Sequence, residues 1–320
     1  MEPKTTWLGS SLLVPCVKEL VAQQPATVPH RYVRPEVHLL SISSSSDAAS
    51  KFQVPVIDMH RCIPRSPWIQ SWRSCTMHAK TGDFSSFLVK KMKKEIQEFF
   101  NLPMEEKKKY WQQEGDMEGF GQAFVVSEEQ KLDWGDMFYM LTLPARLRKP
   151  IYCQSFLFHS GSLFLSLPID TVEAYSSELE KLATKILGLI AKVLRIDPNY
   201  MRDLFEGGFQ AMRMNYYPPC PQPDLVIGLS AHSDAVALTI LLQVNEMEGL
   251  QIKKDGNWVP IKPLPNAFII NIGDILEILT NGIYRSIEHR ATVNSDKERL
   301  SIATFYNPRL DGKWDQPQAS

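Results

Sequence analysis

The sequence predicts an α+β protein in which helices precede a β sandwich or barrel. Two long stretches before residue 200, at 87–101 and 173–194, repeat apolar residues at the spacing of one helix face. After Gly207-Gly208 the chain changes to short β-rich runs separated by Pro and Gly turns. Many short strands with turn signals are typical of a sandwich or barrel, so we expect the helices to pack outside it.

Each element follows from its local pattern. A short helix is expected near 17–23, then a loop with the Ser-rich tract 43–46, then a short apolar strand at 54–57. The first long helix carries its apolar stripe at Phe87, Leu88, Met92, Ile96, Phe99 and Phe100. The second ends at Asp197-Pro198, and its stripe consists of Leu179, Leu182, Ile186, Ile190 and Leu194. Six strands are expected, at 210–216, 237–243, 250–252, 258–260, 268–272 and 300–305.

Composition excludes several classes of partner. The 320 residues are 44% hydrophobic and 22% charged, which is ordinary for a globular protein, and the formal net charge is −1. Such a charge creates no long-range field for nucleic acid or anionic lipid. There is no signal-peptide layout and no run of about 20 apolar residues. The five cysteines show no close pairing pattern, which suits a reducing compartment. We therefore expect a cytoplasmic monomer that binds neither nucleic acid nor membrane.

Two histidines and an aspartate form the most informative pattern. His232 and Asp234 are two residues apart, so in a strand they point the same way, and His289 follows 55 residues after Asp234 (289 − 234). Two imidazoles and one carboxylate are the set that holds a non-haem Fe(II) on one face and leaves the other face open. A lone His-x-Asp is more often a surface pair, so this interpretation depends on what accompanies it.

A second pair repeats the two-residue spacing. Arg299 and Ser301 would place a guanidinium and a hydroxyl on one strand face, where they suit the two oxygens of a carboxylate. An isolated Arg-x-Ser carries little information. Beside the three candidate iron ligands, however, it indicates a 2-oxoacid cosubstrate.

Long motifs surround these residues. They read VPVIDM at 54–59, MRMNYYPPCP at 212–221, NIGDILEILTNGIYRSIEHRATV at 271–293 and ERLSIATFYNP at 298–308. With these motifs the chain resembles the plant Fe(II)/2-oxoglutarate-dependent dioxygenases. Within them it is most similar to the branch of alkaloid O-demethylases and norcoclaurine synthase-like proteins. The resemblance covers about 209–308 without a gap and much of the N-terminal region.

The resemblance implies a fold and a reaction. The fold is a double-stranded β-helix, a jelly roll of the cupin type, with flanking N-terminal helices. The reaction is hydroxylation or O-demethylation of a small plant specialised metabolite by O₂, with release of succinate and CO₂. Alkaloid, flavonoid and hormone-like substrates all fit the resemblance, with a benzylisoquinoline-type alkaloid slightly favoured. Fe(II) is the implied cofactor, 2-oxoglutarate the cosubstrate, and ascorbate is expected to support activity.

The resemblance also assigns roles to residues. Iron would be bound by His232, Asp234 and His289, with no further catalytic residue beyond the metal centre. The cosubstrate would be held by Asn215, Tyr217, Arg299 and Ser301. Arg213 and Phe305 would contact the substrate, and the cluster Phe138-Tyr139-Met140 is a further candidate, although core packing explains that cluster equally well.

The resemblance divides the chain into four parts. Residues 1–50 form an N-terminal helix and Ser-rich loop, 51–200 a mainly helical N-terminal dioxygenase region, 208–308 the jelly-roll domain and 309–320 a truncated tail. Stretches at about 62–84 and 151–169, and the tail, depart from the family pattern. When the three stretches are translated in the same shifted reading frame, with suitable choices of synonymous codons, each becomes similar to the family's sequence. We therefore infer frameshifts or mis-spliced exons, which transcript sequencing tests.

These departures keep a second function open. Loss of the family's strand near 62–84 would leave a sheet edge unpaired, and loss of C-terminal helices would expose apolar surface. The alternative is therefore a degenerate jelly-roll protein that binds a ligand or partner without turnover.

Other polar residues have simpler interpretations. Asp274 and Glu277 are expected to close a turn or a structural hydrogen bond rather than to act in catalysis. The remaining histidines lack partners at ligand spacing, so surface or loop positions are expected for His30, His38, His60, His78 and His159.

Overall fold

The computed structural model describes residues 11–34, 54–59, 76–82, 84–113, 115–152 and 169–309. Several expectations lie outside these ranges. They are the Ser-rich tract, most of the two departing stretches, the tail from residue 310, and the residues His38, His60 and His159.

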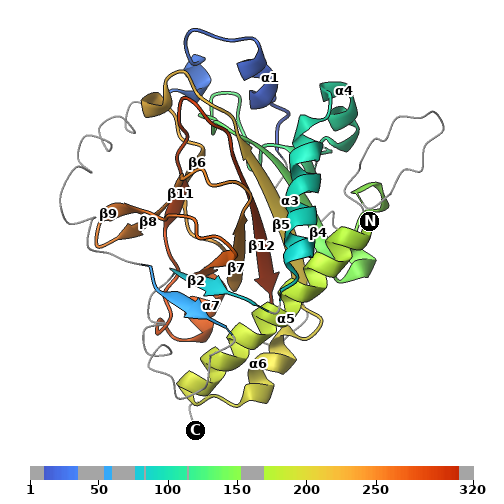
Figure 1. Cartoon of the computed structure of the whole chain (residues 1–320), viewed down its shortest axis with the longest axis vertical. Helices are drawn as coiled ribbons and strands as arrows, with labels where there is room; N and C mark the ends of the chain where they lie inside the picture. The colour runs from blue at the N-terminus through green and yellow to red at the C-terminus, as the bar shows by residue number, and fades with distance from the viewer. Residues whose placement is uncertain are drawn as a thin grey trace, which may run out of the picture.

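Two facing β-sheets and an outer layer of helices build the described part of the chain (Figure 1). The eight-stranded sheet has the order β1 (Val56–Asp58), β2 (Thr76–Lys80), β10 (Ala267–Ile272), β7 (Leu238–Gln243), β12 (Arg299–Asn307), β5 (Phe209–Tyr217), β4 (Asp136–Leu143) and β3 (Gly119–Gly121). The four-stranded sheet has the order β6 (Leu229–His232), β11 (His289–Ala291), β8 (Leu250–Lys254) and β9 (Asn257–Pro260). This confirms the predicted sandwich.

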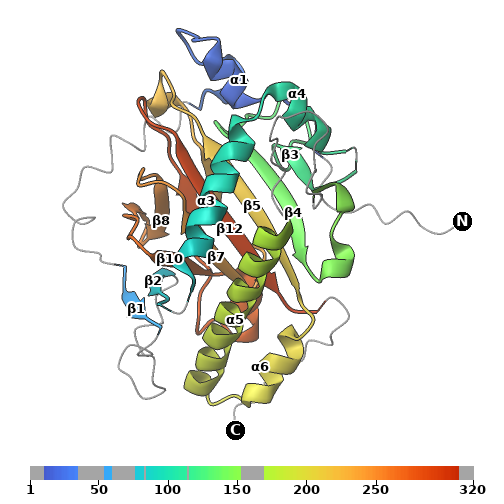
Figure 2. The same cartoon turned by 45° about the vertical axis from the view of Figure 1, so that its right-hand side comes forward.

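Helices α3 and α5 cover the outer face of the large sheet. The α-helices are α1 (Val17–Ala22), α3 (Ser86–Asn101), α4 (Met104–Lys107), α5 (Ile169–Leu194), α6 (Pro198–Phe205) and α7 (Asp274–Leu279). Short 3₁₀ turns are η1 (His30–Tyr32), η5 (Lys108–Tyr110), η6 (Ala145–Leu147), η7 (Pro150–Tyr152) and η8 (Pro223–Leu225). Figure 2 shows α3 and α5 lying across β5, β12 and β7. Among the described residues, no helix is both long enough and apolar enough to cross a membrane.

Burial explains why these strands and helices form. All six residues of β7 and of β10 are buried, because helices cover one face of these strands and the small sheet covers the other. Between the sheets Leu241, Ile269 and Ala303 pack with residues of β8 and β9. The predicted stripe of α3 is confirmed at Met92, Ile96, Phe99 and Phe100, whereas Phe87 is 74% exposed, so its assignment to the buried face was wrong.

The sheets contain strands that the sequence patterns did not indicate. The six expected strands correspond to β5, β7, β8, β9, β10 and β12. Strands β6 and β11 are short and partly polar, and β2, β3 and β4 come from the region expected to be mainly helical. The second long helix does end near the Asp197-Pro198 pair, but Pro198 then begins α6 at the position where proline suits a helix.

The expectation that a strand is lost near 62–84 and leaves a sheet edge unpaired was wrong. Strand β2 pairs antiparallel with β10 and parallel with β1. Met77 and Ala79, two residues apart, supply an apolar face that joins the main core. The pairing with β10 is possible because backbone hydrogen bonds do not depend on which side chains the strand carries. His78 points to the opposite face and is only 4% exposed, so its predicted surface position was also wrong.

The N-terminal segment is docked by a buried carboxylate. Asp136 at the start of β4 accepts hydrogen bonds from the backbone amides of Val17 (2.7 Å) and Lys18 (2.9 Å), the free amides at the start of α1. Further along, Tyr32 packs edge-on against Trp134 with ring centroids 5.2 Å apart. Residues 11–34 therefore lie against the end of the sandwich that carries the start of β4.

Candidate metal centre and carboxylate pocket

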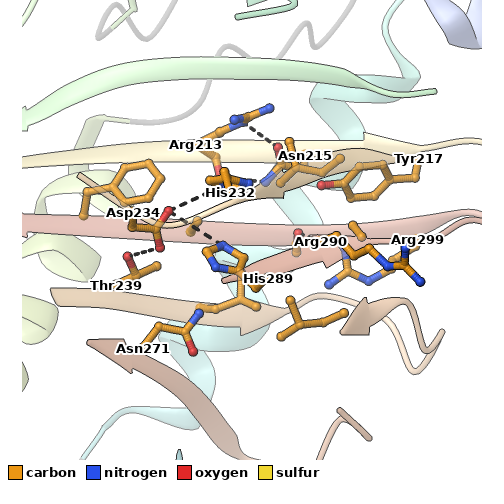
Figure 3. Close-up of a pocket in the computed structure, with 17 residues that line it drawn as sticks. Arg213, Asn215, Tyr217, His232, Asp234, Thr239, Asn271, His289, Arg290 and Arg299 are labelled. Atoms are coloured by element: carbon orange, nitrogen blue, oxygen red, sulfur yellow. Dashed lines mark hydrogen bonds and ion pairs between the residues drawn. The ribbon is translucent and has the colours of Figure 1, made fainter. Parts of the chain in front are cut away.

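The three predicted iron ligands meet at one end of the small sheet (Figure 3). His232 is the last residue of β6 and lies directly across the ladder from His289, the first residue of β11. Asp234 lies two residues beyond the end of β6, in the loop that follows rather than in the strand assumed from its spacing. One ligand atom from each residue lies within 4.8 Å of the others.

Hydrogen bonds hold the ligand atoms in a metal-binding arrangement. Nδ1 of His232 lies 2.8 Å from the carbonyl of Ser230, and Nδ1 of His289 lies 3.0 Å from that of Ile287. A carbonyl oxygen can only accept a hydrogen bond, so Nδ1 must carry the hydrogen in each ring. In a neutral ring Nε2 then presents a lone pair. Those Nε2 atoms lie 3.4 Å and 3.7 Å from Oδ1 of Asp234.

A divalent cation fits this donor set. Three electron-pair donors converge on one point, and a cation between them removes their mutual repulsion. Burial lowers the pKa of His289, which favours the neutral ring that metals bind. Burial raises the pKa of Asp234, but the neighbouring imidazoles and a 2.6 Å hydrogen bond from Thr239 outweigh it, so the net pKa lies below the ordinary value. The carboxyl group is thus kept ionised.

A buried guanidinium occupies the other end of the pocket. Arg299 is 2% exposed, and its Nη2 donates to Oε1 of Gln243 at 2.8 Å, while Nη1 lies 3.4 Å from the Ser301 hydroxyl. Its Nε has no partner among the described residues. The guanidinium also lies over the ring of Tyr217, 5.2 Å from its centroid. A buried guanidinium whose partners are neutral is chemically suited to pair with an anion.

Glycines allow these groups to approach one another. A Cβ atom on Gly249 would lie 2.7 Å from Cδ of Arg299, and one on Gly135 or Gly228 would lie 2.8 Å or 2.9 Å from the ring of Tyr217. Side chains at these three positions would therefore displace the groups that face the pocket.

All nine predicted site residues line one pocket. It opens to solvent and encloses about 460 Å³ when the space at its open mouth is included. Its lining includes the three candidate ligands, the four candidate cosubstrate residues and both candidate substrate contacts: His232, Asp234, His289, Asn215, Tyr217, Arg299, Ser301, Arg213 and Phe305. Arg213 donates from Nε to Oδ1 of Asn215 at 2.8 Å, and the Phe305 and Tyr139 ring centroids lie 6.5 Å apart.

The pocket also contains residues that the sequence patterns did not single out. They are Leu229, Thr239, Leu241, Leu250, Asn271, Arg290, Ala291 and Ala303. Thr239 and Leu241 could have been identified from the alternation of side chains along β7, because they share one strand face with Gln243. Glu277, in contrast, accepts from the backbone amide of Ser286 at 2.6 Å, as expected for a structural role.

Comparison with known families gives two matches. The profile of the 2OG-Fe(II) oxygenase superfamily matches residues 208–308. A second profile, described as the N-terminal region of non-haem dioxygenases in morphine synthesis, matches residues 77–157.

Curated relatives match along nearly the whole chain. Protein SRG1 of Arabidopsis thaliana is 52% identical, with 96% of this chain and 86% of that protein covered. Oxoglutarate-dependent flavonoid 7-O-demethylase 1 of Ocimum basilicum is 51% identical, with coverage of 95% and 80%. Thebaine 6-O-demethylase of Papaver somniferum is 48% identical, with coverage of 95% and 85%.

A solved structure supports the fold. The crystal structure of JOX2 in complex with 2OG, Fe and JA matches with a TM-score of 0.80 and 31% sequence identity, covering 95% of this chain and 86% of that one. The expected jelly-roll architecture is thereby confirmed.

Proposed function

The chain belongs to the 2OG-Fe(II) oxygenase superfamily, and from that premise we propose that it oxidises the methyl group of a small O-methylated aromatic metabolite. As a member of this family it is a dioxygenase that depends on Fe(II) and 2-oxoglutarate. One observation carries the proposal for this chain's own residues. A three-donor metal site and a buried guanidinium without a carboxylate partner line the same pocket.

The metal ligands have defined tasks in this proposal. His232, Asp234 and His289 would hold the iron, since one donor atom from each converges beside the pocket. When bound, iron supplies the oxidation of a C–H bond at the expense of 2-oxoglutarate and O₂, which end as succinate, CO₂ and the inserted oxygen atom. The protein supplies orientation and keeps water away.

The far end of the pocket orients the cosubstrate. Arg299 presents its guanidinium to the distal carboxylate, and the Ser301 hydroxyl stands beside it on the same strand face. Burial raises the pKa of Tyr217, so its phenol stays protonated and remains a hydrogen-bond donor to that carboxylate. Asn215 precedes Tyr217 by two residues on β5 and lies between Tyr217 and His232 (Figure 3), where its amide would contact the cosubstrate.

Oxidation of a methyl ether accounts for the overall reaction. Hydroxylation of R–O–CH₃ gives the hemiacetal R–O–CH₂OH, which breaks its C–O bond to release formaldehyde and leave R–OH. The oxygen in formaldehyde comes from O₂, and the second atom enters succinate. Three relatives of about 50% identity are named as O-demethylases, one of a flavonoid, one of thebaine and one of codeine, which supports methyl ethers as the substrate class.

The lining of the pocket favours an uncharged aromatic substrate. Among the described residues that line it, Asp234 is the one carboxylate, and it belongs to the metal site. A protonated amine therefore meets no counter-ion beyond the metal ligands, while Phe305 offers an aromatic surface and Arg213 a hydrogen-bond donor. We accordingly place a methoxylated phenolic compound ahead of the alkaloid that the resemblance alone favoured.

Two assays test this proposal. Anaerobic addition of Fe(II) and 2-oxoglutarate to purified protein should produce a weak visible charge-transfer band, which His232→Ala abolishes and Arg299→Gln weakens. Admission of O₂ with a methoxyflavone should then give formaldehyde and succinate in equal amounts, and a methoxylated benzylisoquinoline alkaloid should react more slowly.

The outcomes separate the competing functions. A band without succinate from any substrate would favour the alternative of binding without turnover, for which no described residue provides support. A faster reaction with the alkaloid would reverse the substrate order. Absence of the band from folded protein would refute the site assignment.

A further inference from the structure

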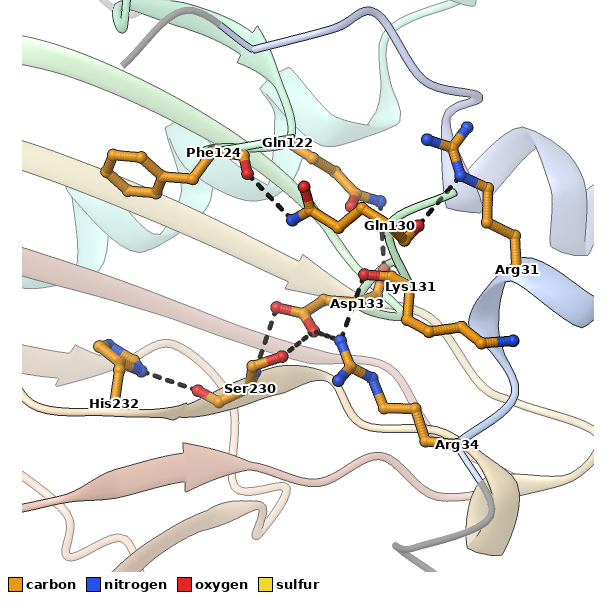
Figure 4. Close-up of polar contacts among 9 residues, drawn as sticks. All are labelled: Arg31, Arg34, Gln122, Phe124, Gln130, Lys131, Asp133, Ser230 and His232. Carbon is orange, nitrogen blue, oxygen red and sulfur yellow. Dashed lines mark hydrogen bonds and ion pairs between the residues drawn. The ribbon is translucent and has the colours of Figure 1, made fainter. Parts of the chain in front are cut away.

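Asp133 joins the N-terminal segment to the strand that carries His232 (Figure 4). Its carboxylate accepts two hydrogen bonds from Ser230, one from the hydroxyl at 2.5 Å and one from the backbone amide at 3.1 Å. The carbonyl of the same Ser230 accepts the Nδ1 hydrogen of His232 at 2.8 Å. Ser230 therefore lies between the carboxylate and the imidazole, bonded to both.

The N-terminal segment fixes the other side of this carboxylate. Arg34 donates from Nη2 to Oδ1 of Asp133 at 3.1 Å and to the carbonyl of Lys131 at 3.3 Å. The backbone carbonyl of Asp133 also accepts from Nε2 of Gln122 at 3.1 Å. Both oxygens of the carboxylate are thus engaged, and its orientation is determined from two directions.

His232 depends on such support more than His289 does. The side chain of His232 is 33% exposed, whereas that of His289 is 8% exposed and packed within the sandwich. Packing therefore restricts the His289 ring, whereas the more exposed His232 ring depends more on its few polar contacts, among them the hydrogen bond to Ser230. A ligand that can rotate binds a metal less tightly, because ordering it on binding costs conformational entropy.

The stretch from Asp133 to Gly135 also supports the cosubstrate end of the pocket. Gly135, two residues after Asp133, packs against the ring of Tyr217, and a Cβ atom there would lie 2.8 Å from that ring. Trp134 between them is fully buried and donates its backbone amide to Ile227 at 2.7 Å. This short stretch is therefore fixed in place and is able to transmit its position to both ends of the pocket.

We propose that Asp133 is a positioning residue for the metal centre, acting through Ser230 on His232 and oriented by Arg34 from the N-terminal segment. The proposal rests on His232 being an iron ligand, as proposed above. It adds that iron affinity depends on a carboxylate that does not touch the metal.

The test measures iron affinity rather than turnover. The dissociation constant for Fe(II) is determined anaerobically at saturating 2-oxoglutarate from the charge-transfer band, together with the melting temperature of the metal-free protein. Asp133→Asn turns one carboxylate oxygen into an amide donor that must face the amide of Ser230 or the guanidinium of Arg34, and neither can accept a hydrogen bond. Loss of such support is expected to weaken Fe(II) binding about 10- to 100-fold.

Matched variants separate orientation from general stability. Ser230→Ala removes one of the two hydrogen bonds to Asp133 and should weaken Fe(II) binding less than Asp133→Asn, while Ser230→Thr keeps the hydroxyl and should restore it. Gln130→Ala serves as the control, because Gln130 braces the same loop through the Phe124 carbonyl and the Val126 amide without touching Asp133. It should leave Fe(II) affinity unchanged.

Each outcome decides the proposal. Weaker Fe(II) binding in Asp133→Asn and Ser230→Ala, with recovery in Ser230→Thr, supports it. An unchanged dissociation constant with a lower melting temperature means that Asp133 only stabilises the fold, and overturns the proposal while leaving the proposed function intact. If the wild-type protein binds no Fe(II), or His232→Ala binds it equally well, both are overturned.

Discussion

Replacement of Arg299 by glutamine should separate cosubstrate binding from folding. Glutamine keeps a planar donor at the end of the side chain but removes the charge and one edge of the guanidinium fork. Arg299 is 2% exposed, and its side-chain hydrogen bonds among the described residues go to the neutral side chains of Gln243 and Ser301. The charge is therefore available to an anionic ligand.

The expected size follows from the lost interaction. A hydrogen bond to a charged group contributes about 1.5–3 kcal/mol, and each 1.4 kcal/mol is about tenfold in an equilibrium constant. The KM for 2-oxoglutarate should thus rise about 10- to 100-fold in Arg299→Gln. Turnover at saturating 2-oxoglutarate should change much less, because the lost contact lies away from the methyl group that reacts.

The ligand-free protein should respond in the opposite direction. Burial lowers the pKa of Arg299, which means that its position disfavours the charged form when no anion is present. The melting temperature of the ligand-free Arg299→Gln variant should therefore equal or exceed that of the wild type, and the gain in melting temperature on adding Fe(II) and 2-oxoglutarate should shrink.

Arg290 provides the matched control. It lines the same pocket, but its guanidinium lies 4.2 Å from the ring centroid of Trp258 and its Nε donates to Gln251 at 2.8 Å. Steady-state assays with varied 2-oxoglutarate should show a KM within about threefold of wild type for Arg290→Gln. The assignment of Arg299 is refuted if its own variant stays within that range, or if both variants raise the KM equally.

Three further predictions test the pocket, the core and a buried acid. Gly249→Ala places a methyl group 2.7 Å from Cδ of Arg299, so it should raise the KM for 2-oxoglutarate and cost about 1–3 kcal/mol of stability; an unchanged KM would contradict the close fit. Phe99→Ala, within an aromatic cluster and 3% exposed, should lower the free energy of unfolding by about 3–5 kcal/mol in urea titrations, whereas Phe87→Ala at 74% exposure should change it by less than about 0.5 kcal/mol. Burial raises the pKa of Glu95 above its ordinary 4.5, so the folded state holds this proton more tightly than the unfolded state. Wild-type stability should therefore fall relative to Glu95→Gln as pH rises from about 4.5 through the raised pKa, and a pH-independent difference between the two would refute this.

Elements with a strong local pattern could be predicted from the amino-acid sequence. The stripe of α3, the long helix α5 and the apolar strands β7 and β10 follow from periodicity, since each must bury one or both faces. The candidate ligands and the carboxylate-binding pair also follow from their spacing and the surrounding motifs, and they line one pocket. Family membership and dependence on Fe(II) and 2-oxoglutarate are confirmed, whereas the cytoplasmic location and the monomeric state stay predictions.

The tertiary structure decided the features that depend on distant partners. Strands β6 and β11 are three or four residues long, and pairing with each other rather than local propensity makes them strands. Strand β2 was not indicated by the sequence patterns, and it forms because β1 and the edge of β10 offer it backbone partners. Arg299 meets Gln243 across 56 residues, and Asp133 meets Ser230 across 97. No local pattern encodes such contacts, because the register of the sheets brings these side chains together only after the sandwich has closed.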